Sequence, residues 1–130
     1  MAIQHIPIET SLGVLFGRDC IYLDSAECDD KRQVLTLKGE VNGTLVSNAP
    51  RDAWISYELR FLGVVWHRRA DLDADWSWKA SFEERKNTPN LRKHPGAARH
   101  YFVQTYDDVF DVLCDSYELE FIKERSRSGV

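Results

Sequence analysis

The chain has 130 residues, which suits a single domain that buries its core without cross-links. Seventeen lysines and arginines against 21 aspartates and glutamates give a formal net charge of −4, which argues against general nucleic-acid binding. Three cysteines without a CxxC pair argue against a disulfide framework. Because the sequence shows neither a signal-peptide pattern nor a long apolar run, we expect a soluble, cytoplasmic protein with no membrane contact.

The first 32 residues predict short strands joined by turns. Ile6 and Ile8 flank a proline, which donates no backbone hydrogen bond, so this segment is expected at a sheet edge. Two apolar runs, at 12–16 and 20–23, surround a glycine, a pattern typical of a β-hairpin. The polar stretch 25–32 is expected to be a loop.

The middle of the chain predicts a second hairpin and a long strand. Residues 33–41 alternate, and the Asn-Gly pair at 42–43 is a strong turn signal, so 44–47 is expected to return antiparallel. Residues 54–67 alternate over the greatest length, and Gly63 marks an interruption. If this strand is an exposed edge, it offers a contact for a homo-oligomer.

The segment from 68 to 100 lacks a regular period, apart from one helical turn predicted at 81–86. It is rich in lysine and arginine and is broken by Asn, Pro and Gly. These features predict a long, irregular basic loop, which in a compact domain is usually functional.

Three aspartates in that segment, Asp71, Asp73 and Asp75, alternate as at the start of a calcium loop. Trp76 and Phe82 then stand where an EF-hand needs glycine and glutamate, so the sequence leaves cation binding open. The chain has no GxSxG motif and no glycine-rich phosphate loop. We therefore predict no catalytic residue and no cofactor.

The last third predicts strand, helix and strand. Residues 101–105 are aromatic and β-branched, 107–115 place apolar residues on a helical stripe after a capping Thr105, and 117–121 alternate again. With the rest of the chain this predicts one α+β domain over 1–122, followed by a polar tail. Its largely antiparallel, curved sheet of six or seven strands would pack on the short helix at about 107–115.

An acidic ridge on the predicted helix and the following strand is the leading candidate site. Like charges four residues apart destabilise a helix slightly, so we interpret them as kept for binding a partner protein with a basic surface. Small size, acidity and the lack of a catalytic motif are similar in type to bacterial immunity proteins and phage-encoded inhibitors. The candidate contacts are Asp107, Asp111, Asp115, Glu118 and Glu120.

An alternative hypothesis is an enzyme or ligand-binding module for a phosphate-containing small molecule. Guanidinium groups hold phosphate oxygens in pairs, and an imidazole can transfer a proton. The basic turn after the long strand and the histidines of the 68–100 segment supply both groups. The residues of this candidate anion site are His67, Arg68, Arg69, His94 and His100.

Overall fold

A computed structural model describes residues 2–46, 53–71 and 80–122. This part of the chain is built almost entirely of short strands, with one 3-10 helix, η1 (Gly43–Leu45), and one α-helix, α1 (Pro89–Lys93). The strands are β1 (Gln4–Pro7), β2 (Glu9–Thr10), β3 (Gly13–Val14), β4 (Ile21–Asp29), β5 (Val34–Asn42), β6 (Trp54–Leu62), β7 (Trp66–Asp71), β8 (Phe82–Lys86), β9 (Arg99–Gln104), β10 (Asp108–Cys114) and β11 (Ser116–Phe121).

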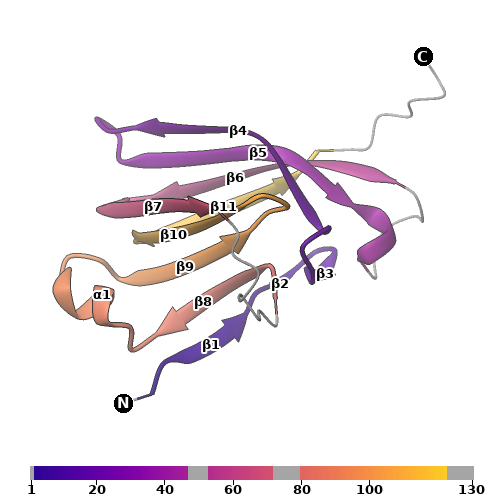
Figure 1. Ribbon diagram of the computed structural model, residues 1–130. Helices are drawn as coiled ribbons and strands as arrows, with labels where there is room; N and C mark the ends of the chain where they lie inside the picture. The colour runs from indigo at the N-terminus through magenta and orange to yellow at the C-terminus, as the bar shows by residue number, and fades with distance from the viewer. Residues whose placement is uncertain (1, 47–52, 72–79, 123–130) are drawn as a thin grey trace.

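The strands form two larger antiparallel sheets and a small β2-β3 pair (Figure 1). One sheet has the order β1-β8-β9-β10-β7, and the other has the order β11-β6-β5-β4. The prediction of largely antiparallel pairing is therefore confirmed. The predicted α+β domain with one curved sheet of six or seven strands is wrong in detail, because the described residues are mainly β and form separate five-stranded and four-stranded sheets. Two chain segments pass directly from one sheet to the other, β6 into β7 and β10 into β11, so the sheets share a corner.

Gly63 lies at that corner and explains the interruption in the sequence pattern. Its φ is +68°, and a Cβ at this position would lie 2.2 Å from a carboxylate oxygen of Asp115. The backbone ladder continues around the bend, because the Val65 amide donates to the Leu113 carbonyl at 2.9 Å and the Asp115 amide to the Leu62 carbonyl at 2.9 Å. Only glycine combines this backbone conformation with so close a neighbour.

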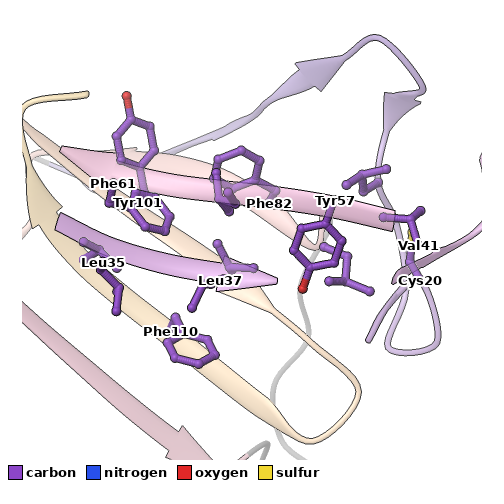
Figure 2. Packing of buried hydrophobic residues seen from close by; sticks show 14 of the residues in the cluster. Cys20, Leu35, Leu37, Val41, Tyr57, Phe61, Phe82, Tyr101 and Phe110 are labelled. Carbon is purple, nitrogen blue, oxygen red and sulfur yellow. The ribbon is translucent and has the colours of Figure 1, made fainter. Parts of the chain in front are cut away.

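The core lies between the two sheets and is dominated by aromatic contacts (Figure 2). Phe61 from the four-stranded sheet meets Phe82 and Tyr101 from the five-stranded sheet, with ring centroids 6.3 and 5.8 Å apart. Tyr117 of β11 contacts the same two rings, each at 5.1 Å. Burial of these rings, together with the leucine, isoleucine and valine side chains of the same cluster, holds the sheets together.

The predicted helix at about 107–115 is wrong, because β10 (Asp108–Cys114) occupies that stretch as an inner strand between β9 and β7. Both faces of β10 are buried, so its sequence reads as a nearly continuous apolar run, which can equally be read as a helical stripe. Val109, Phe110 and Val112 are residue types that prefer strands, and pairing on both sides decides the outcome.

The segment 68–100 is also more regular than predicted. It contains the end of β7, all of β8 and the start of β9, so the helical turn expected at 81–86 is the strand β8, and α1 is a short helix capped by Thr88. Asp73 and Asp75 lie outside the described residues, and Asp71 ends β7. The basic residues of this segment therefore belong mainly to strands, whose pairing fixes where they point.

Two predicted hairpins are replaced by other connections. The run 12–16 contains β3, which pairs with β2 and not with β4, and β4 extends through most of the expected loop at 25–32. After β5 the Asn-Gly pair does not turn the chain into a strand, because the Asn42 side chain accepts from the Thr44 amide and starts η1. Local turn residues are present, but distant pairing selects the connection.

The long strand 54–67 is divided at the corner into β6 and β7. β6 pairs with β5 on one side and with β11 on the other, so residues 54–62 form no exposed edge. Trp66 and His67, at the end of the predicted strand, begin β7, which lies at one edge of the five-stranded sheet. β1 lies at the other edge, as its proline predicted.

Candidate functional site

The predicted acidic ridge does not form one surface. Asp107 lies exposed in the turn between β9 and β10, and Asp115 lies exposed at the corner between the sheets. Glu118 and Glu120 lie on the exposed face of β11, where Glu118 pairs with Arg60. Asp111 is buried, with 3% of its surface exposed. The helix that would have aligned these residues is absent, so they point in different directions.

Asp111 is the centre of a buried polar network on the face of the five-stranded sheet that points away from the core. One of its oxygens contacts His100 Nε2, and the other accepts from Arg68 at 3.1 Å. The other ring nitrogen of His100 lies 2.7 Å from the hydroxyl of Thr88, the N-cap of α1. The network thus joins strands β7, β9 and β10 to the helix.

A second carboxylate, Glu83, occupies a similar position two strands away. It is 2% exposed, and one of its oxygens lies 2.7 Å from His5 of β1 and 2.7 Å from Nε of Arg85. The Arg85 guanidinium also lies 3.6 Å from the ring centroid of Phe102, which stands between the two carboxylates in the register. Each buried acid is therefore matched by an arginine and a histidine.

This arrangement satisfies its own charges. Among the described residues no buried side-chain nitrogen or oxygen lacks a hydrogen-bond partner. The Thr88 hydroxyl is 3% exposed and accepts from the Leu91 amide, so it is held as a helix cap and not presented as a nucleophile. Buried, fully paired polar groups fix the geometry of a fold. We interpret the network as structural.

The candidate anion site is only partly assembled. Arg68 pairs with Asp111, and Arg69 pairs with Asp108 at 2.8 Å, so both guanidinium groups already face carboxylates. His67 is exposed on β7, whereas His94 ends α1 with its ring 6.1 Å from that of Trp66. Within the described ranges no group of three or more His, Cys, Asp or Glu side chains is placed to hold a metal ion.

A different group of residues gathers at the end of the strands where the β9-β10 turn meets the start of β4 (Figure 1). The rings of Tyr22 and Tyr106 stack with centroids 5.2 Å apart and planes 13° apart, and Trp54 meets Tyr22 edge-on at 5.1 Å. The Arg18 guanidinium lies 4.6 Å from the Tyr106 ring centroid, and its Nε donates to the Tyr106 carbonyl at 2.9 Å. We call Arg18, Tyr22, Trp54 and Tyr106 the aromatic end.

Tyr22 is held in place by its backbone. Its carbonyl accepts from the hydroxyl of Tyr57 at 3.0 Å, and β4 has an irregular register between Leu23 and Ser25. Gly39 opposite makes this possible, because a Cβ there would lie 1.9 Å from the Tyr22 carbonyl oxygen. The bulge and the glycine together set the direction of the Tyr22 side chain.

Tyr106 is presented by a rigid turn. The Thr105 hydroxyl accepts from the Asp108 amide at 3.1 Å, and the Thr105 amide donates to the Asp108 carbonyl at 2.8 Å. The first of these bonds is the one expected for a helix cap, but here it closes a β-turn. The Tyr106 amide also donates to the Ile21 carbonyl at 2.9 Å, which ties the turn to β4. Tyr106 remains 37% exposed on this fixed base.

Two aspartates lie next to members of the aromatic end in the chain. Asp19 and Asp107 are exposed and directly follow Arg18 and Tyr106 in the chain. Burial and the carboxylate of Asp19 raise the pKa of the Tyr22 hydroxyl, and Asp107 acts in the same direction. Both carboxylates therefore act on the same side chain, although they come from different loops.

Sequence reasoning missed the aromatic end because its members are up to 88 positions apart, from Arg18 to Tyr106, without a motif. The available signal was an aromatic residue inside the turn sequence Thr-Tyr-Asp-Asp, where loops usually carry polar residues. An exposed tyrosine held by a turn has a high contact area and little side-chain entropy to lose, which makes it a typical contact residue.

Comparison with known proteins gave no match to a family model, to a curated protein or to a solved structure. In the described segments no helix is long and apolar enough to cross a membrane. The function is therefore inferred from the residues and their geometry.

Proposed function

We propose that this protein is a small, non-enzymatic binding protein that contacts another protein through its aromatic end. The observation that supports the proposal is the stack of the exposed Tyr106 on the part-buried Tyr22, held by backbone hydrogen bonds, with Arg18 against it. Tyrosine, tryptophan and arginine are the residues most enriched at the energetic centres of protein interfaces. The aromatic end contains all three types.

Rigidity supports the same proposal. An interface pays less entropy when its side chains are fixed before the partner arrives. Tyr22 and Tyr106 are fixed by backbone bonds and by each other, and neither contributes to the central cluster between the sheets. Their arrangement is better suited to contact than to stabilising the core. An inhibitor-type role, in which this surface covers a basic site on the partner, would use it directly.

The test is site-specific photo-crosslinking of the whole chain in its native host. A photoreactive phenylalanine analogue at Phe16, which is 51% exposed and two residues before Arg18, should give a cross-linked partner. The same analogue at Val65, 45% exposed at the corner between the sheets, is the matched control and should give none.

A second variant ties the cross-link to the proposed surface. Tyr106→Ala should remove the Phe16 adduct while the protein stays folded, because Tyr106 is part-exposed in a turn. Equal adducts from both positions, or an adduct that survives Tyr106→Ala, would overturn the proposal.

A further inference from the structure

From the aromatic end we infer the chemistry of the contact, an inference that rests on the proposed function. The geometry points to an arginine or lysine side chain of the partner protein as the group that binds against the Tyr22-Tyr106 pair, between the carboxylates of Asp19 and Asp107.

The first argument is that the aromatic end already holds a guanidinium. Arg18 lies 4.6 Å from the Tyr106 ring centroid and is tethered by a single hydrogen bond from Nε to the Tyr106 carbonyl. It makes no ion pair with any described carboxylate, unlike Arg60, Arg68 and Arg69. The electron-rich face of the ring is therefore a cation site occupied by a weakly held internal cation.

Two acidic residues directly follow Arg18 and Tyr106 in the chain. Asp19 and Asp107 are both exposed and make no ion pair within the described residues, and both act electrostatically on Tyr22. An ammonium or guanidinium group of the partner would form ion pairs with both carboxylates and a cation–π contact with a ring face. An anionic partner would meet the repulsion of the two aspartates, and this difference determines the preferred partner charge.

Several basic and acidic groups of the two sites predicted from the sequence are already paired. The guanidinium groups of the predicted anion site face Asp111 and Asp108, and Glu118 faces Arg60. The aromatic end combines the exposed ring of Tyr106 and the part-buried ring of Tyr22 with carboxylates that make no ion pair within the described residues. Binding would move Arg18 aside, because the incoming cation uses the same ring.

The experiment uses a probe of defined charge. An eight-residue peptide of alternating arginine and serine is titrated into the isotope-labelled full chain, with a glutamate-serine peptide as control. Backbone amide shifts should move at 18–24 and 105–108 with the arginine peptide only. Asp19→Lys with Asp107→Lys should weaken binding about 5- to 30-fold, because two exposed ion pairs are lost and two like charges are introduced.

Two further variants distinguish this inference from general charge attraction and from binding of an anionic group. Glu27→Lys with Glu120→Lys makes the same change in net charge on exposed positions outside the aromatic end and should leave binding within about twofold. Arg18→Gln removes the internal cation and should strengthen binding of the arginine peptide. Equal weakening by both charge reversals, or weaker binding after Arg18→Gln, would overturn the inference.

Failure of this inference can be distinguished from failure of the proposed function. If the arginine peptide moves no amide of the aromatic end while the Tyr106-dependent cross-link at Phe16 persists, the surface binds a protein through its rings without a cation. If the glutamate peptide binds and Arg18→Gln abolishes that binding, the ligand is anionic and the inference is wrong. If the Tyr106-dependent cross-link at Phe16 is not observed, the proposed function itself is overturned.

Discussion

The charged network on the five-stranded sheet and the aromatic end use the same residue types in opposite ways. Arg68 and Arg85 pair with Asp111 and Glu83, which are 3% and 2% exposed and which also contact His100 and His5. Arg18 instead lies on a ring and has no carboxylate partner among the described residues. Perturbed charge clusters often mark functional sites, but a fully paired buried cluster also serves simply to hold strands together.

This difference predicts that mutations in the two regions affect different properties of the protein. Substitutions in the charged network should lower the free energy of unfolding and affect binding only through loss of fold. Substitutions at the aromatic end should weaken binding at nearly constant stability.

The largest effect is expected for Asp111→Ala. The substitution leaves His100, which is 2% exposed, without its carboxylate and deprives Arg68 of its partner. We expect a loss of about 2–4 kcal/mol in the free energy of unfolding, the range for breaking buried charge-assisted hydrogen bonds. Urea denaturation followed by circular dichroism measures it.

Glu120→Ala is the matched control, because this acid was assigned to the same ridge by sequence but is exposed on β11. It should change stability by less than about 0.5 kcal/mol. Similar losses for the two variants would show that Asp111 is not a structural centre.

Gly39→Ala is expected to have the next largest effect and to connect the two regions. The added methyl group would lie 1.9 Å from the Tyr22 carbonyl oxygen and 2.9 Å from its carbon, so β4 and β5 must separate there. Overpacking of this kind costs about 2–3 kcal/mol. Because the shift occurs beside Tyr22, cross-linking from Phe16 should also decrease.

The control for this variant is Gly96→Ala. A Cβ at Gly96 meets nothing within 4 Å, so thermal unfolding should be almost unchanged. A melting temperature for Gly39→Ala that equals that of Gly96→Ala would contradict the tight approach of the two strands.

The sheet-rich fold could be predicted from the sequence because alternation in β5, β6 and β11 reflects one buried and one exposed face. β10 could not, because both of its faces are buried and its period is lost. The one charge inside that run, Asp111, was the sign of a buried polar partner. Its partners come from β7 and β9, so only the register of the sheet reveals them.

The same limit applies to the candidate sites. Arg68, His100 and Asp111 were named from the sequence, but in two competing hypotheses, and the structure joins them in one network. Tyr22 and Tyr106 were not named, because a contact between the start of β4 and the β9-β10 turn depends on how the sheets are placed. Residue type identifies candidates, whereas strand pairing decides which candidates meet.

A third prediction concerns alkaline pH and compares buried with part-exposed hydroxyl and thiol groups. Burial raises the pKa of Cys20 to about 11 and the pKa values of Cys114 and Tyr101 to about 12. Since these groups ionise earlier in the unfolded chain, stability should fall as pH rises above about 9, by at most about 1.4 kcal/mol per pH unit for each group.

Tyr22 at the aromatic end should ionise without unfolding, because its ring lies outside the central cluster. Tyrosinate absorbance should therefore begin to rise before the near-ultraviolet circular dichroism of the core is lost. A single transition shared by both signals would contradict the separation of the two regions.

The smallest effect is expected for Arg68→Gln together with Arg69→Gln. Both arginine side chains are more than half exposed, at 57% and 53%, and the buried carboxylate of Asp111 keeps its contact with His100 when Arg68 is replaced. Exposed ion pairs contribute about 0.2–1 kcal/mol each, so the melting temperature should fall by only a few degrees.

The same double variant decides between the network and an anion site on β7. If Arg68 and Arg69 are engaged by Asp111 and Asp108, millimolar phosphate should not stabilise the wild-type protein measurably more than the variant. A phosphate-dependent rise in melting temperature that the double variant abolishes would show that these pairs open for an anion. The exposed face of β7 would then be a second binding region, and the assignment of all partner contact to the aromatic end would fail.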